Sequence, residues 1–229
     1  MLQLNWDGNR QYTSFCYNDI VPLYGARGLD QPGFVYDYSW VEDGLTRYME
    51  YPVLAGLFQG VASFISRNTY FLVDRVLPEV GWYFYVTVFI LSVIWVATVR
   101  MVAELAGNRI WDTLLVVGSP LLIMHSFTNW DIPSIFFAVA AIYAARNKKF
   151  WLAGVMIGLG TAFKMWPIFA LGAYLVVALR KRDLVPFLKM VAATVVSWVA
   201  VNLPIYLRDP EAWGEFRRLN TDRSWEWTT

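Results

Sequence analysis

The stretch VGWYFYVTVFILSVIWVATV, residues 80–99, decides the fold, because none of its 20 side chains is charged at neutral pH. A transmembrane α-helix needs about 20 mainly apolar residues to cross a hydrocarbon core of about 30 Å. The whole chain is 57% hydrophobic and 16% charged, whereas average soluble domains are about 45–50% apolar and about 25% charged. We therefore predict an all-α integral membrane protein.

Further apolar segments follow this first span, which we place near 80–100. They predict a polytopic bundle with helices near 110–127, 132–146, 150–163, 165–180 and 184–206. Before the first span, the Gly- and Pro-punctuated head predicts loops with short helices. Its apolar segment EYPVLAGLFQGVASFIS is short for a span and fits better as a helix at the membrane surface.

Basic residues in three short loops set the orientation of this bundle, because cytoplasmic loops carry an excess of Lys and Arg. These loops contain Arg100 and Arg109, then Arg146, Lys148 and Lys149, and then Arg180, Lys181 and Arg182. The predicted organisation is an extracytoplasmic loop with surface helices at 1–79, a transmembrane bundle at 80–206 and a second extracytoplasmic loop at 207–229.

A break at FKMWP, residues 163–167, interrupts the segment that begins and ends on the cytoplasmic side. Each half has about 14–15 uncharged residues, or roughly 21 Å of helix at 1.5 Å per residue, which is short of a full crossing. Pro167 disfavours helix at Trp166. We therefore predict a recess below the outer surface with Lys164 at its floor. GVMIGLG just before the break lies within an apolar helix, where small residues serve close helix packing.

Composition excludes several kinds of site. The single cysteine, Cys16, and the single histidine, His125, cannot build a disulfide framework, a thiolate metal site or a multi-histidine metal centre. The net charge of +1 gives no indication of nucleic-acid binding. The chain opens on polar residues without a secretory signal, and a polar head outside the cell requires a preceding hydrophobic segment. We therefore expect the sequence to be a fragment.

Two aspartates in the predicted outward loops are candidate site residues. Asp19 fits either a cap for a helix that begins near Val21 or a general base that takes a proton from a hydroxyl. Asp131 fits either an N-cap before Ile-Pro-Ser or a substrate contact. Asn129 fits an interface anchor or a substrate contact, and His125 a packing residue or a ligand contact.

The cations of the same face form a second group of candidates. A cation between two apolar half-helices costs about 2.5–3.5 kcal/mol, so Lys164 either extends to the outer surface or pairs with a lipid-borne phosphate. The tail fits an ordinary solvated loop or a clamp for phosphate and sugar. Its candidate residues are Arg217, Arg218, Asn220, Arg223 and Trp225.

Five motifs in order carry a resemblance to a known family: YNDIVPLYGARGL, EYPVLAG, NWDIPSI, GLGTAFKMWPIF and NLPIYL followed by EFRRLNTDRSWEW. Together they resemble the family-87 glycosyltransferases of the GT-C superfamily. The best-described relatives are polyprenyl-phosphate-mannose-dependent α-mannosyltransferases and related arabinosyltransferases of bacterial envelope assembly. The resemblance covers about the first half of such an enzyme, since relatives have one helix before this sequence and several after it.

The resemblance implies a catalytic Asp in the first extracytoplasmic loop, and Asp19 matches that position. It implies a recess for the donor phosphate at Lys164, with the NWD turn and the Arg-rich tail along the same side. The expected activity is inverting transfer of mannose, or of arabinose, from a polyprenyl phosphate to a hydroxyl of a glycolipid or polysaccharide. The expected location is the bacterial plasma membrane, with the site on the extracytoplasmic face.

No cofactor is expected. Two acids would suit Mg²⁺ or Mn²⁺, but a monophosphate donor does not require a metal. Two other functions stay open at this stage. A transporter or flippase for lipid-linked sugars would also use broken helices with a buried cation, and predicts inverted repeats. A non-catalytic membrane subunit predicts loss of the motif acids, yet Asp19 and Asp131 are both present.

Overall fold

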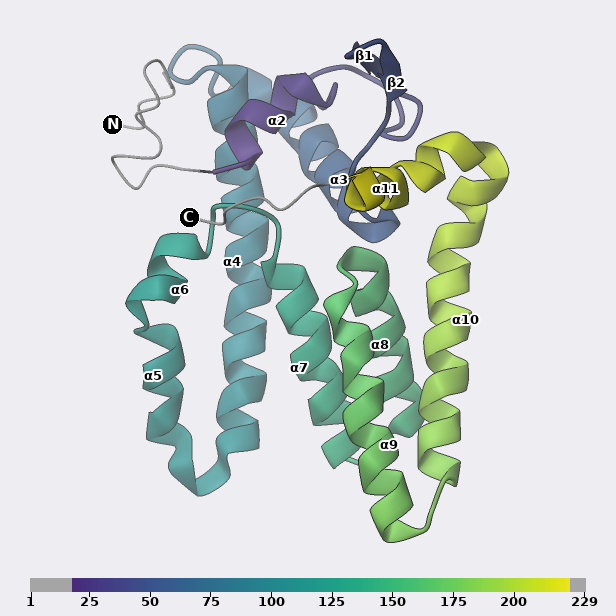
Figure 1. The fold of residues 1–229 in the computed structure, drawn as a ribbon. Helices are drawn as coiled ribbons and strands as arrows, with labels where there is room; N and C mark the ends of the chain where they lie inside the picture. Colours follow the sequence, from purple (N-terminus) through teal and green to yellow (C-terminus); the bar gives the residue numbers. More distant parts are fainter. Residues whose placement is uncertain (1–17, 223–229) are drawn as a thin grey trace.

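Four helices form the body of the structure, a computed structural model that describes residues 18–222. They stand side by side in the order α4, α7, α8 and α10 (Figure 1). Their bounds are Glu79–Ala106, Ile132–Arg146, Phe150–Phe163 and Val185–Arg208. Almost all of the regular structure is therefore helical, as the hydropathy pattern predicts.

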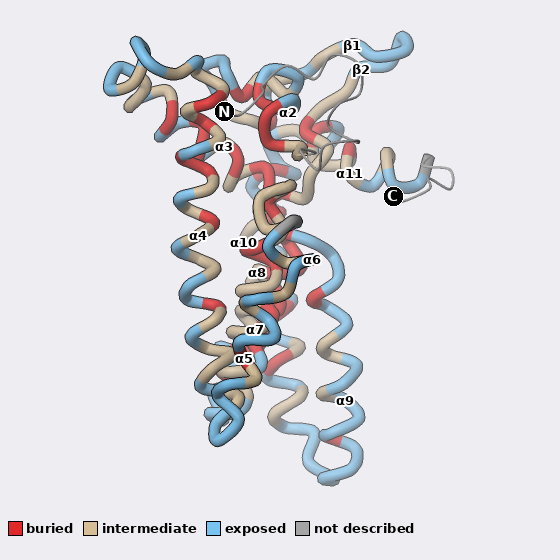
Figure 2. The backbone as a smooth tube through the Cα atoms, turned by 90° about the vertical axis from the view of Figure 1, so that its left-hand side faces the viewer, coloured by how far each residue is buried: buried red, intermediate tan, exposed pale blue. Residues whose placement is uncertain are grey.

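A head of further elements covers one end of these helices (Figure 1). It contains α2 (Ile20–Ala26), β1 (Trp40–Glu42), β2 (Leu45–Arg47), α3 (Val53–Thr69), η2 (Tyr70–Leu72) and α11 (Pro210–Asp222). The largest buried cluster joins α2, α3 and the upper part of α4. Figure 2 shows the same distribution, with buried residues in the head and along the inner helices, and exposed residues over α5 and α9.

Among residues 18–222, length and composition single out two segments that could cross a membrane. They are Glu79–Val117 and Val185–Arg208, while α7 and α8 are apolar but shorter. The three basic loops lie together at the end of the bundle away from the head (Figure 1). The turn before α7 and the end of α8 point toward the head. The structure thus separates the same two groups of loops that the charge pattern separates.

The predicted helices at 132–146 and 150–163 are confirmed to the residue, and those at 80–100 and 184–206 are confirmed with shifted ends. The single helix predicted at 110–127 is wrong. This segment forms η3 (Gly107–Asp112), α5 (Thr113–Val117) and α6 (Pro120–His125). Gly118 ends α5, Ser119 is extended and Pro120 begins α6, because proline tolerates the first helical turn but not the interior.

The break predicted near FKMWP is present, although its position differs. Lys164 has extended backbone angles, φ −155° and ψ 137°, and ends α8. Trp166 is helical, contrary to the expectation from the following proline, because it begins the 3-10 turn η4 (Trp166–Phe169) with Pro167 in its first turn. The chain then returns along α9 (Ala170–Lys181). The predicted pair of short helices is therefore confirmed.

Two elements were absent from the sequence-based expectation. Strands β1 and β2 form a hairpin with Trp40 opposite Arg47. Its turn residues Asp43 and Gly44 both have positive φ, 53° and 75°, which is the pattern of a type I′ turn. The tail, expected as a loop, forms α11, whose first amides, Glu211 N and Ala212 N, donate to Asp209 Oδ1 at 2.9 and 3.0 Å.

Small residues let α8 lie very close to α10. A Cβ added at Gly154 would stand 2.3 Å from the carbonyl oxygen of Met190, and one at Gly158 would stand 2.5 Å from that of Thr194. Thr194 Oγ1 also donates to the Gly154 carbonyl at 3.0 Å. The predicted packing role of the glycines in GVMIGLG is confirmed, and this contact holds α8 against α10.

Candidate active site

A cavity of about 450 Å³ lies where the head meets the ends of α7 and α8. Its walls come from the start of α2, the start of α3, the turn before α7, the α8–η4 junction and α11. Its polar lining residues are Asp19, Glu50, Asn129, Asp131, Lys164 and Asn220. The structure thus brings five predicted site residues, far apart in the sequence, to one cavity.

Asp131 and Lys164 form an ion pair between Oδ1 and Nζ in this cavity. Both side chains remain about half exposed, at 44% and 46%, so both charges can reach a ligand. Asp131 occupies the N-cap position of α7, but its side chain makes no capping hydrogen bond. Instead, Asn129 Oδ1 accepts the Asp131 amide at 3.1 Å. Of the two alternatives for Asp131, the carboxylate geometry therefore favours a site role over a capping role.

Asp19 lines the same cavity from the N-cap position directly before α2. Asn18, and not Asp19, caps this helix: Val21 N donates to Asn18 Oδ1 at 2.9 Å. The Asp19 amide donates to the carbonyl oxygen of Thr128 at 2.6 Å. This bond joins the loop of Asp19 to the turn that carries Asp131.

Helix α2 is held in place from its other side by Tyr24. Its hydroxyl donates to Glu79 Oε1 at 2.7 Å, and its ring stacks on Tyr83 with centroids 4.4 Å apart. Burial and the hydrogen bond to Glu79 raise the pKa of the Tyr24 hydroxyl well above its usual value, so it remains a neutral donor. The position of Asp19 is therefore fixed by contacts to α4 as well as to the Thr128 turn.

Glu50 is a lining residue that the sequence interpretation missed. Its two oxygens accept hydrogen bonds from Arg27 Nε and Nη2 at 3.1 and 2.9 Å, and the Arg27 guanidinium lies 4.3 Å from the centre of the Trp40 ring. Because this guanidinium already occupies both oxygens, Glu50 is a weak candidate for proton abstraction. In the sequence, Glu50 is an acid directly before Tyr-Pro. This pattern alone does not indicate a site, because the role of Glu50 depends on its pairing with Arg27.

Helix α11 closes the cavity on one side through Phe216, Leu219 and Asn220. Arg218, predicted as a phosphate contact, does not line the cavity: it donates to the Thr46 carbonyl at 2.7 Å and pairs with Glu215 at 2.5 Å. Arg217 is exposed and also lies outside the lining. Arg218 therefore joins α11 to the β1–β2 hairpin, whereas Arg217 remains exposed outside the cavity lining.

Three further predicted residues lie elsewhere. His125 is exposed at the end of α6 and does not line the cavity. Arg223 and Trp225 lie outside the described residues. Among residues 18–222, no three His, Cys, Asp or Glu side chains gather in an arrangement that could hold a metal ion. The expectation of metal-independent chemistry stays a prediction.

Comparison with known families gives one match. The family described as "Glycosyltransferase family 87" matches residues 69–228, which is well over half of the 229-residue chain. The matched segment includes Asn129, Asp131, Lys164 and Asn220, and it begins after Asp19 and Glu50. No curated protein and no solved structure matches the sequence.

Proposed function

Because the chain belongs to glycosyltransferase family 87, we propose that it is a membrane-embedded, GT-C-like glycosyltransferase that uses a polyprenyl-phosphate sugar donor. The observation that carries this proposal is the cavity in which Asp19, Asp131 and Lys164 converge. Two acids beside one cation suit a reaction in which a hydroxyl loses a proton while a phosphate leaves. Mannose is the proposed sugar, and a hydroxyl of an envelope glycolipid or polysaccharide is the proposed acceptor.

In the proposed reaction the acceptor hydroxyl gives its proton to Asp19 while its oxygen attacks the anomeric carbon. The bond from that carbon to the phosphate oxygen breaks, and its electron pair leaves with the lipid phosphate. Attack from the opposite face of the sugar inverts the configuration. Such base catalysis contributes about 10²–10⁴-fold, and positioning in the cavity supplies the remainder.

Lys164 is the proposed partner of the leaving phosphate. Negative charge grows on this phosphate as the glycosidic bond breaks, so a fixed cation stabilises the transition state more than the ground state. Asp131 holds Lys164 through the ion pair and orients sugar hydroxyls. Asn220 of α11 offers a further hydrogen-bonding group in the cavity wall.

The proposed location is a bacterial plasma membrane, crossed more than once. Two helices are long and apolar enough to cross it, and the basic loops lie at the end away from the cavity. By the excess of positive charge in cytoplasmic loops, the cavity faces the extracytoplasmic side. A polyprenyl chain in the bilayer could then present its phosphate to Lys164.

Transfer of radiolabelled sugar in membranes that contain the chain tests this proposal. We expect Asp19→Asn to lower the rate by about 10²–10⁴-fold, while Asp30→Asn, an exposed acid of the same segment, leaves it unchanged. Full activity of Asp19→Asn combined with loss in Asp131→Asn would move the base to Asp131. Absence of transfer by the wild type from both mannosyl and arabinosyl donors would overturn the function. A parallel assay with EDTA tests the expected independence of metal.

A further inference from the structure

A second cavity, of about 630 Å³, lies at the end of the bundle away from the candidate active site. It opens where the ends of α7 and α9 meet the beginnings of α8 and α10. Arg146, Lys148 and Lys181 contribute three cations to its lining, and Asp183 contributes the single carboxylate. The cavity is therefore positively charged.

The local contacts of these groups leave the two lysines without a carboxylate. Arg146 Nη1 donates to the Glu104 and Leu105 carbonyls at 3.2 and 2.7 Å, at the end of α4. Asp183 Oδ1 accepts the Val185 amide at 3.1 Å and so begins α10. Within the described part of the chain, no carboxylate forms an ion pair with Lys148 or Lys181.

The remainder of the lining is mainly apolar and aromatic. Phe150, Tyr174, Phe187 and Met190 form much of it. Beside the cavity, α9 exposes Val176, Val177 and Leu179. Cations next to such a surface suit a ligand with an anionic group and an apolar body.

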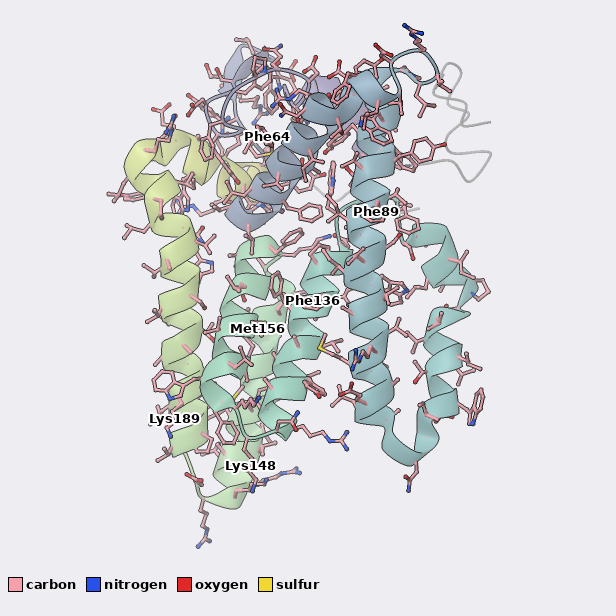
Figure 3. The ribbon with its side chains drawn as sticks, turned by 180° about the vertical axis from the view of Figure 1, so that it is seen from behind. Phe64, Phe89, Phe136, Lys148, Met156 and Lys189 are labelled. Carbon is pink, nitrogen blue, oxygen red and sulfur yellow. The ribbon has the colours of Figure 1, made fainter. Side chains whose placement is uncertain are left out.

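A smaller cavity of about 320 Å³ adjoins this one and shares Lys148 and Phe150 with it. It adds two more cations, Lys149 and Lys189. Figure 3 shows Lys148 and Lys189 near the same end of the bundle. Lys189 comes from α10, whereas Lys148 precedes α8, so the positive charge extends over several elements.

We propose that this basic cavity binds the headgroup of an anionic phospholipid from the inner leaflet. The inference rests on the membrane location within the proposed function, but not on sugar transfer. A lipid phosphodiester offers anionic oxygens to Lys148 and Lys181, and its acyl chains can follow the apolar sides of α9 and α10. Basic pockets between transmembrane helices on the cytoplasmic side are suited to such headgroups.

The alternative is that the cations only orient the chain in the membrane. Orientation requires an excess of Lys and Arg in the loops, but it requires neither a cavity nor an aromatic lining. It also predicts that every loop cation contributes equally to the affinity for anionic lipid. The two readings therefore differ in whether Lys148 and Lys181 are special among the cations of this end.

Lipid binding to the purified full chain tests the proposal. Native mass spectrometry would compare phosphatidylglycerol with phosphatidylcholine of the same acyl chains, for the wild type and for Lys148→Gln/Lys181→Gln. We expect the wild type to prefer phosphatidylglycerol and the double variant to lose about five-fold in its affinity per lysine removed. Arg180→Gln, one residue from Lys181 but outside the cavity lining, should bind as the wild type does.

Each outcome decides the matter. Equal losses of affinity per cation removed, in the double variant and in Arg180→Gln, would overturn the proposal in favour of diffuse charge. Equal binding of both lipids would overturn it as well. Displacement of the lipid by inorganic phosphate at comparable concentration would identify a site for soluble anions instead. Recovery of binding in Lys148→Arg/Lys181→Arg, with sugar transfer unchanged throughout, would support a lipid site independent of catalysis.

Discussion

The loops of Asp19 and Asp131 share a local arrangement that explains how two carboxylates reach one cavity. In each loop an asparagine one or two residues earlier accepts a backbone amide: Asn18 accepts that of Val21 in the first turn of α2, and Asn129 accepts that of Asp131 itself. A neutral side chain thus stabilises the start of α2 and the turn before α7. The adjacent carboxylate can then take part in the cavity, where Asp131 meets Lys164.

The Asp131–Lys164 pair leads to a prediction that separates function from folding. With both side chains about half exposed, the pair contributes no more than about 1 kcal/mol to stability. A cation that meets charge developing in the transition state contributes much more, about 10²–10³-fold in rate. We therefore expect Lys164→Gln to lower sugar transfer by about 10²-fold with little change in the melting temperature.

A matched variant makes this result interpretable. Arg75→Gln removes an exposed cation at the head end, outside the cavity, and should retain the wild-type rate. If Lys164→Gln transferred sugar as fast as the wild type, Lys164 would serve only to neutralise Asp131. If it unfolded instead, the pair would be structural.

The site residues that could be predicted are charged side chains that stand alone beside apolar segments. Lys164 stands alone between apolar helices, and Asp131 stands at the entry of one, so each was visible as an exception. Glu50 was missed because its meaning depends on Arg27, which lies 23 residues away. Arg218 was expected in the site because the tail is rich in arginine. Its actual partner, the Thr46 carbonyl, lies 172 residues away in the sequence, so the tail alone does not indicate this contact.

Among the elements, the contact between α8 and α10 depends on the absence of side chains. A Cβ at position 154 would meet a backbone oxygen of Met190 at 2.3 Å, and a backbone cannot rotate away as a side chain can. We expect Gly154→Ala to destabilise the fold by about 1–3 kcal/mol, because overpacking forces the helices apart. Thermal unfolding in detergent would measure the loss.

Gly172 provides the comparison, because it lies in α9 with nothing within 4 Å of an added Cβ. Gly172→Ala should be neutral or stabilising by up to about 1 kcal/mol through helix propensity. Equal destabilisation of the two variants would show that the close approach of α8 to α10 does not limit stability.

Helix α11 is tied to the hairpin by a buried carboxylate. Glu215 is 1% exposed and lies between Arg47 of β2, at 3.6 Å, and Arg218, at 2.5 Å. Glu215→Ala would leave the partly buried Arg47 without this counter-charge and should cost about 2–3 kcal/mol. Because α11 carries Phe216, Leu219 and Asn220 into the cavity wall, we also expect faster proteolysis of the tail and weaker donor binding.

Glu211→Ala is the matched change on the same helix. Its carboxylate accepts a 3.3 Å hydrogen bond from Tyr48 and is exposed, so the loss should stay below about 0.5 kcal/mol. If Glu211→Ala and Glu215→Ala opened the tail equally, the buried ion cluster would not be the attachment point.

The bundle helices were predictable because charged residues and prolines mark their ends. The hairpin and α11 were not predicted, although each carries a short local signal. Asp43-Gly44 is a hairpin turn pair, and Asp209-Pro210 places a capping acid before a first-turn proline. Both signals lie in polar, aromatic-rich segments without a helical or alternating apolar pattern. The composition of these segments therefore favoured a prediction of loops. Contacts between head and tail, such as Arg218 with Thr46 and Arg47 with Glu215, then hold the two segments together.

Across the whole molecule, charge is divided between two ends that serve different proposed roles. The head end gathers acids and one lysine around a cavity, whereas the other end gathers lysines and arginines around a second cavity. The length of α4 and α10 separates these ends. A catalytic site for an external acceptor and an anchor in the inner leaflet would then share the same helices without competing for them.

This division predicts the accessibility of the two ends in spheroplasts of an expression host. In a Cys16→Ala background, we would introduce Val41→Cys in the hairpin and Arg109→Cys in η3, both of which are strongly exposed. A membrane-impermeant maleimide should label the hairpin variant at once and the η3 variant only after permeabilisation, because basic loops remain on the cytoplasmic side. Immediate labelling of both would show that the chain does not span the membrane. The reverse pattern would place the cavity of Asp19 and Lys164 inside the cell, where an acceptor outside the membrane could not reach it.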